Sequence, residues 1–345
     1  MTTQRWQIFG GFLLAATALQ AAPGLCQISD EGRACFQGGV PDEQLIVSCT
    51  AVIQAKDAKP QDLSGAFNNR GTAYRNKRDY DRAIADFSES IRLDPTSFAA
   101  FSGRGETHLY KHDYDRAIQD FSEALRLHPI WTPALTSRGV AYASKGDYER
   151  AIQDLTGAVK LSPNNPGAFA VRGNAHFQRR EFDQAIADYS EAIRLNPRVA
   201  SLFYQRGLVH HVKDDFDRAI GDYSEVIKLD PNNASAFNNR GVAYRSKGEH
   251  ERALADFGKS IELDPDTGLG FGNRGIACYN LAQYDRAIDD YTAALRFDPK
   301  DAASRYGRGM AKLKRGDTAG GNADLAEAKA MRPSIAAEQA RNSVR

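Results

Sequence analysis

The sequence predicts an all-α protein, an α-solenoid built from consecutive helical hairpins. Glycine recurs every 34 residues from Gly71 to Gly309, and proline recurs at the same interval from Pro95 to Pro333. Neither series is interrupted by an insertion, and each period contains two stretches of apolar residues at helical spacing. A fixed period of about 20 to 50 residues indicates a repeat architecture, in which each unit stacks on its neighbours.

The first segment, residues 1–22, is predicted to be a secretory signal peptide. Arg5 is its only charge, an apolar run follows from residue 8 to 19, and small residues at Ala21 and Ala22 suit cleavage. An uncleaved membrane anchor is the alternative, and the short run disfavours it because a span needs about 20 apolar residues. We therefore expect an exported protein, periplasmic in a Gram-negative bacterium or secreted from another host, with no membrane insertion after cleavage.

Residues 23–63 are predicted to form an N-terminal cap. Three of the chain's cysteines lie there, and in an exported protein two of them should form a disulfide. Spacing alone does not identify the pair among Cys26, Cys35 and Cys49, and we favour Cys35 with Cys49. The run LIVSCTAVIQ belongs to a predicted helix from Glu43 to Gln54 and is similar to IADFSESIRL, the second helical stretch of the first repeat. We interpret the segment as a half-repeat that covers the open end of the stack.

Eight units follow the cap, and each is predicted to be a helical hairpin. In the sixth unit, Ala253 and Phe257 share one stripe of the second helix, Gly248 suits a left-handed turn between the helices, and Pro265 ends the unit. The eighth unit is degenerate, with polar substitutions and two extra glycines that are typical of a terminal cap. A C-terminal tail, residues 336–345, follows and could continue into a covering helix. The units span residues 64–97, 98–131, 132–165, 166–199, 200–233, 234–267, 268–301 and 302–335.

This pattern resembles the tetratricopeptide repeat family, and the resemblance extends from Ser64 to Pro333. Counted from the start of each unit, most units carry a bulky residue at position 4, glycine at 8, alanine at 20, an aromatic residue at 24 and proline at 32. The resemblance implies a right-handed superhelix of hairpins that acts as a protein–protein interaction scaffold. Glycine at position 8 is expected to let the two helices of a hairpin approach closely. These structural glycines are Gly71, Gly105, Gly139, Gly173, Gly207, Gly241 and Gly275.

Every unit also carries arginine at position 7 and aspartate at position 23, for example Arg138 and Asp154. Such a ladder could bind anions along the stack, or it could form structural ion pairs within or between hairpins. We favour the structural role. Residues that contact a ligand should differ between units, whereas a residue present in every unit serves the stacking that all units share.

Specificity is expected at the positions that vary between units. In the family, positions 2, 5, 9, 12 and 13 of the first helix line a concave groove that binds extended peptides or helices. A peptide is favoured here because aromatic anchors and amides suit a peptide and its backbone, and a glycan or cell-wall fragment held by groove aromatics is the alternative. The lysine at position 5 with which some family members clamp chaperone C-termini is absent. The candidate groove residues are Asn68, Arg75, Glu106, Tyr110, Asn174, Phe177, Tyr204, His211, Asn238, Arg245 and Tyr279.

Composition and motifs disfavour other classes of function. The formal net charge of the 345 residues is +1, so no charge excess attracts the phosphate backbone of a nucleic acid. Histidines at position 11 of three units stand where other units carry tyrosine, and we expect them to pack within the repeats instead of binding metal. The sequence contains no recognisable nucleophile with a base, phosphate loop or metal-ligand cluster. We therefore expect no enzyme activity, no cofactor and no metal, while the identity of the protein or peptide partner and the oligomeric state stay open.

Overall fold

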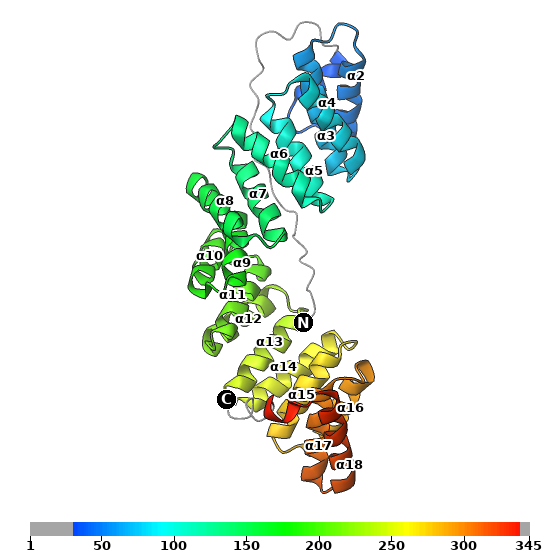
Figure 1. The fold of residues 1–345 in the computed structure, drawn as a ribbon, viewed down its shortest axis with the longest axis vertical. Helices are drawn as coiled ribbons and strands as arrows, with labels where there is room; N and C mark the ends of the chain where they lie inside the picture. The colour runs from blue at the N-terminus through cyan, green and yellow to red at the C-terminus, as the bar shows by residue number, and fades with distance from the viewer. Residues whose placement is uncertain (1–29, 339–345) are drawn as a thin grey trace. The chain divides into compact units, whose positions relative to one another are not determined.

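The computed structural model describes residues 30–338, and within that range all regular secondary structure is helical (Figure 1). The predicted signal peptide and Cys26 lie outside the described residues. The described residues divide into two compact units, of which the first ends at Leu161 and the second begins at Ser162. The first unit holds α1 Asp30–Arg33, the 3-10 helix η1 Ala34–Phe36, α2 Asp42–Gln54, α3 Pro60–Asn76, α4 Tyr80–Leu93, α5 Phe98–Tyr110, α6 Tyr114–Leu127, α7 Thr132–Ser144 and α8 Tyr148–Leu161. The second holds α9 Pro166–Gln178, α10 Phe182–Leu195, α11 Ala200–Val212, α12 Phe216–Leu229, α13 Ala234–Ser246, α14 His250–Leu263, α15 Gly268–Asn280, α16 Tyr284–Phe297, α17 Ala302–Arg315 and α18 Thr318–Met331.

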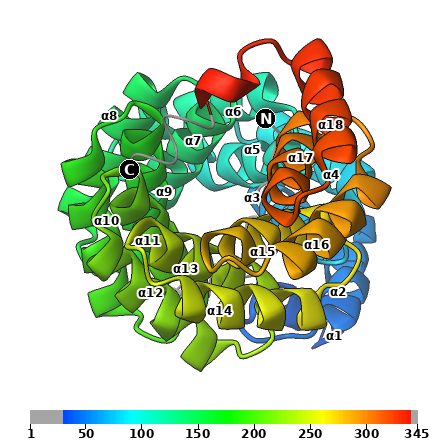
Figure 2. The same ribbon diagram turned by 90° about the horizontal axis from the view of Figure 1, so that it is seen from below.

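The odd-numbered helices from α3 onward are the first helices of the hairpins, and we call them the first-helix layer. Within the first unit α3 contacts α5 and α5 contacts α7, and within the second unit α13 contacts α15 and α15 contacts α17. In the second unit, α11, α13 and α15 lie on the inner side of the curve, and α10, α12 and α14 lie outside them (Figure 2). The second helices thus form the outer layer of this unit.

The two helices of a hairpin pack closely where glycine faces an aromatic ring. A Cβ atom added to Gly241 would lie 2.8 Å from the ring of Phe257, a distance that real Cβ atoms essentially never show. Phe257 and Ala253, one turn before it, are fully buried. The equivalent aromatic contacts pair Gly71 with Phe87, Gly105 with Phe121, Gly173 with Tyr189, Gly207 with Tyr223 and Gly275 with Tyr291, and in the third hairpin Gly139 faces Leu155 instead of a ring.

A left-handed residue ends the first helix of each hairpin. At Gly248 the φ angle is 78°, as the sequence pattern predicts, and the N–H of Glu249 reaches back to the carbonyl of Tyr244 at 2.9 Å. Glycine adopts this conformation without strain because it lacks a Cβ atom. Five hairpins use another residue at the same place, with φ between 57° and 62°: Arg78, His112, Arg180, Asp214 and Ala282.

The N-terminal cap is joined by the Cys35–Cys49 disulfide, which confirms the favoured pairing. The bond links η1 to α2, and both cysteines belong to a buried cluster with Val52. Thr50 accepts a hydrogen bond from Arg70 at 3.0 Å, as Ser88 accepts one from the next arginine in the series. Cys49 therefore takes the place of an aromatic core residue. Thr50 thus corresponds to Ser88 of the first repeat, a register that the similarity of the two segments did not specify.

The segment after α18 ends in a short helical turn. Ile335 is fully buried, and the hydroxyl of Ser334 lies 2.5 Å from a carboxylate oxygen of Glu338. Residues 335–338 are helical, and residues 339–345 lie outside the described part. Between residues 30 and 338, no helix is long and apolar enough to cross a membrane.

Candidate functional site

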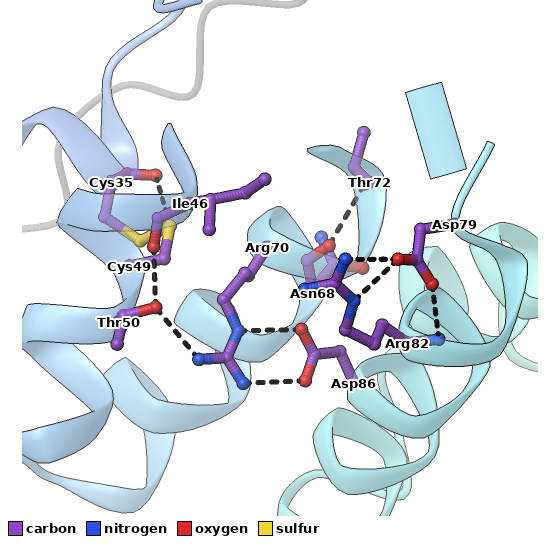
Figure 3. A network of polar contacts seen from close by, with 10 residues as sticks. All are labelled: Cys35, Ile46, Cys49, Thr50, Asn68, Arg70, Thr72, Asp79, Arg82 and Asp86. Carbon is purple, nitrogen blue, oxygen red and sulfur yellow. Dashed lines mark hydrogen bonds and ion pairs between the residues drawn. A yellow bond between two sulfur atoms is a disulfide. The ribbon is translucent and has the colours of Figure 1, made fainter. Parts of the chain in front are cut away.

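The arginine–aspartate ladder joins the two helices of every hairpin. Figure 3 shows its first member: Arg70 on α3 binds both carboxylate oxygens of Asp86 on α4, and its remaining nitrogen reaches Thr50 on α2. In all eight pairs the closest nitrogen–oxygen distance lies between 2.6 and 2.8 Å. The other pairs are Arg104–Asp120, Arg138–Asp154, Arg172–Asp188, Arg206–Asp222, Arg240–Asp256, Arg274–Asp290 and Arg308–Asp324.

Arg138 shows what such a pair does. Its guanidinium donates two hydrogen bonds to Asp154 on α8, at 2.7 and 2.8 Å, and a third to the hydroxyl of Ser122 on α6, at 3.0 Å. Only 8% of the Asp154 side chain is exposed, and hydrogen bonding to this carboxylate raises the pKa of Arg138. The guanidinium therefore links three helices, and its charge is already paired with Asp154, which is a structural arrangement.

The residues at position 11 lie beside the aspartates of the ladder. His108 Nε2 is 4.0 Å from Asp120, and His210 Nε2 is 4.0 Å from Asp222. Burial lowers the pKa of both imidazoles, which keeps the rings neutral at pH 7. The third, His176, bonds Glu181 through Nδ1 at 2.6 Å. No group of three or more His, Cys, Asp or Glu side chains within the described part of the chain could hold a metal ion.

In the first unit, two predicted groove residues neutralise each other. Arg75 on α3 donates from Nη1 to Glu106 on α5 at 2.5 Å, and the arginine side chain is 9% exposed. Asn68 donates to the neighbouring amide of Asn69 at 3.2 Å. Tyr110 is 54% exposed and stacks on Tyr80, with the ring centroids 5.9 Å apart. This part of the first-helix layer thus satisfies its own charges.

In the second unit a chain of hydrogen bonds crosses α15, α13 and α11. Arg245 Nη1 donates to Asn273 Oδ1 at 3.4 Å, and Asn273 Nδ2 donates to Asn238 Oδ1 at 2.9 Å. Asn238 Nδ2 donates to Asn239 Oδ1 at 3.3 Å, and Asn239 Nδ2 donates to Tyr204 Oη at 2.9 Å. We call these five residues the amide network. Each amide accepts from one neighbour and donates to the next, so all three have a defined orientation.

Two further predicted groove residues flank the amide network. His211 precedes Arg245 by one repeat, and the pKa of its imidazole is lowered by burial and then by the charge of Arg245. Tyr279 follows Arg245 by one repeat, and burial raises the pKa of its phenol. The three side chains occupy position 12 of consecutive hairpins, so they follow one another along the first-helix layer of the second unit.

Most of the predicted groove aromatics also pack inside the repeats. Phe177 packs against the buried cluster that contains Tyr189, and Tyr204 packs against the cluster that contains Phe203. Tyr279 makes an edge-to-face contact with Tyr284, at 5.6 Å between centroids. Asn174 accepts a hydrogen bond from the hydroxyl of Tyr189 at 2.6 Å. Tyr110 is the one predicted aromatic that is largely exposed among those the structure describes.

Sequence reasoning missed Asn239 and Asn273, which complete the amide network. Both stand at position 6, which the family pattern does not assign to the groove. A signal was present, because position 6 is asparagine only at Asn69, Asn239 and Asn273 and differs in the other units. Side chains at position 6 lie beside the preceding hairpin, which brings Asn273 within reach of Asn238 and Asn239 within reach of Tyr204.

Comparison with known families gives matches along the chain. Models described as tetratricopeptide repeat match residues 65–97, 102–166, 234–267 and 269–301, and a model described as TPR repeat matches residues 173–214 and 212–245. A comparison with curated proteins gives no match.

Several solved structures resemble the fold. The structure titled as the functional characterization of Pseudomonas aeruginosa pilF is 18% identical with a TM-score of 0.53, covering 60% of this chain and 95% of that one. A tetratricopeptide repeat protein from Parabacteroides merdae is 18% identical with a TM-score of 0.52, covering 72% of this chain and 98% of that one. A crystal structure of MamA is 30% identical with a TM-score of 0.46, covering 47% of this chain and 94% of that one.

Proposed function

Because this chain belongs to the tetratricopeptide repeat family, we propose that it is an exported scaffold or adaptor that binds a peptide or helix of a protein partner along its first-helix layer. The amide network carries the proposal. Asparagine side chains arranged in a row offer both donors and acceptors, which is what the N–H and C=O groups of an extended peptide require.

The distribution of varying residues supports the same face. The ladder arginines and aspartates are the same in every hairpin and already pair with each other, whereas the residues at positions 5, 9 and 12 of the first helices change from unit to unit. A partner that contacts the varying side chains would be selected by them. We therefore assign recognition to the first-helix layer and stacking to the ladder.

A glycan is a less favoured ligand. Sugar recognition through aromatics requires ring faces that are open to solvent, and Phe177, Tyr204 and Tyr279 pack against other side chains of their own repeats. These rings still supply edges and two hydroxyls, those of Tyr204 and Tyr279, which fits amide recognition better than ring stacking.

Two observations support export. The pattern of residues 1–22 is that of a signal peptide, and the Cys35–Cys49 disulfide is stable in an oxidising compartment such as the periplasm. Cell fractionation and N-terminal sequencing of the protein from its own host would test this. Cleavage after Ala21 or Ala22 is expected, and an intact N-terminus on a reduced cytoplasmic protein would contradict it.

The binding proposal is tested by presenting the immobilised full chain with a synthetic library of random-sequence peptides. Hydrogen exchange of the complex with a retained peptide should show protection in α11, α13 and α15 and little in α12 and α14. Val212 on α11 is 49% exposed, so Val212→Arg should weaken binding by about tenfold without loss of fold. Lys228 on α12, with 73% of its side chain exposed, provides the outer-layer control through Lys228→Glu. Equal effects of the two substitutions would place binding elsewhere.

A further inference from the structure

Arg245 is a half-buried cation without a counter-ion. No carboxylate among the described residues lies within ion-pair distance of its guanidinium, and its single hydrogen bond is the 3.4 Å contact with Asn273. A guanidinium carries five N–H donors, so most of its donors are unused. Burial lowers the pKa of Arg245, as expected for a cation that is desolvated without compensation.

The chain contains an internal comparison for this arginine. Arg75 occupies the same position of the first repeat as Arg245 does of the sixth, and its guanidinium is bound by Glu106 on the next first helix. The residue that corresponds to Glu106 in the seventh repeat is Ile276. Ile276 packs against the buried cluster that contains Cys278. The same arginine position therefore exists once with its own carboxylate and once with an apolar side chain in that carboxylate's place.

The surroundings of Arg245 add no negative charge. Its neighbours in the amide network are neutral, and His211 is kept neutral in part by the charge of Arg245 itself. A desolvated charge without a partner opposes folding, so stability does not explain this arrangement. An anion that arrives with a partner would explain it.

The geometry points to a carboxylate of a bound peptide as that anion, and we propose that Arg245 binds it in the position that Glu106 occupies on Arg75. This inference rests on the proposed peptide-binding function and names the feature that the peptide must carry. A carboxylate is favoured over other anions because the chain itself places one on the equivalent guanidinium, and two N–H groups of arginine match the two oxygens of a carboxylate.

The carboxylate can come from an acidic side chain or from the C-terminus of the peptide. Three versions of the random peptide library separate the sources: one with free C-termini, one with amidated C-termini, and one amidated and synthesised without Asp and Glu. Retention of the first version alone assigns the C-terminus, and equal retention of the first and second assigns an acidic side chain.

The variants follow from the internal comparison. Arg245→Gln should lower the affinity for retained acidic peptides by about tenfold or more, because a hydrogen-bonded charge pair is lost at the interface. Ile276→Glu should have a similar effect, because the new carboxylate would occupy Arg245 from within the protein. Arg218→Gln is the control and should change affinity less than about twofold, because Arg218 lies on the outer-layer helix α12, has 73% of its side chain exposed and pairs with Asp215. Circular dichroism checks the fold of each variant, and Ile276→Glu serves as the test if Arg245→Gln does not fold.

The outcomes distinguish this inference from the proposed function. Peptides that bind the wild-type protein only when they carry a carboxylate, and that lose affinity in Arg245→Gln but not in Arg218→Gln, support it. Peptides that bind wild type and Arg245→Gln equally, or that bind without Asp, Glu or a free C-terminus, overturn it and leave the peptide-binding function intact. A chain that retains no peptide of any version contradicts both.

Discussion

Replacing Arg138 with methionine tests whether the ladder of ion pairs holds the hairpins together. Methionine keeps much of the length and apolar volume of the side chain but removes all three hydrogen bonds of the guanidinium. Asp154 stays in place with 8% of its side chain exposed, so its charge is left buried without a partner.

The expected cost is about 3 to 5 kcal/mol, the range for breaking a buried ion pair by removing one member. Three hydrogen bonds are lost, two of them to a charged group, and bonds to charged groups contribute about 1.5 to 3 kcal/mol each. The 21% exposure of the arginine lets some water reach the site, which favours the lower half of the range.

Urea unfolding followed by circular dichroism measures the loss, and hydrogen exchange locates it. Repeat proteins are stabilised mainly by contacts between neighbouring units, so exchange should rise first in α7, α8 and the adjacent α6. A second change, Asp154→Leu, should recover much of the loss in the double variant because the unpaired charge is then removed. Lys145→Met is the control in the same hairpin, since Lys145 pairs with Asp115 at the surface and should contribute less than about 1 kcal/mol.

The reasoning is refuted if Arg138→Met costs less than about 1 kcal/mol, or if Asp154→Leu in the double variant recovers nothing. The first result would mean that the pair is solvated like a surface pair. The second would mean that the loss comes from packing, and not from a stranded charge.

Three further predictions follow from single residues. Burial lowers the imidazole pKa of His210, so its contribution to stability is complete above pH of about 6.5 and is lost as the pH falls through the folded-state pKa. In His210→Tyr the urea midpoint should therefore change less between about pH 7 and 5 than in wild type. An equal change of the midpoint in both proteins would refute this. Ala282 has a φ of 57°, so Ala282→Gly should raise the free energy of unfolding in urea by about 1 kcal/mol. Gly248→Ala is the opposite control and should lower it. A lower free energy of unfolding for Ala282→Gly would contradict the strain argument. The disulfide between Cys35 and Cys49 closes a short loop, with a sequence separation of 14. Replacing both cysteines with serine should lower the free energy of unfolding by about 3 kcal/mol and speed hydrogen exchange in α2. Unchanged exchange in α2 would refute the role of the disulfide in the cap.

The repeat architecture could be predicted from the sequence because local signals repeat. Gly241 and Phe257 stand 16 residues apart in a pattern that recurs with the period, and each copy adds evidence for the same hairpin. The left-handed turn at Gly248 was predicted for a similar reason, since glycine at that place has a local steric cause. Where Ala282 stands instead, the sequence carries no such signal, and packing of the hairpin imposes the conformation.

The N-terminal cap was predicted in outline but without its register. Its helix and its disulfide partners are set by local composition and by the small number of cysteines. The alignment of Cys49 depends on which side chain meets Arg70 from the neighbouring hairpin, and that contact involves a residue 20 positions away. The cap is a single atypical unit, so no recurring pattern in the sequence defines how it aligns with the repeats.

The sequence by itself determined the hairpins, their number and the residues that every hairpin needs, because helix formation and glycine–ring packing depend on side chains within one repeat. Only the tertiary structure decided which varying residues act together. The amide network joins side chains of neighbouring hairpins, and the pairing of Arg75 but not of Arg245 depends on what the next first helix presents, Glu106 in one case and Ile276 in the other. Charge compensation in this protein is a property of adjacent repeats, so no single repeat reveals which of its charges are paired.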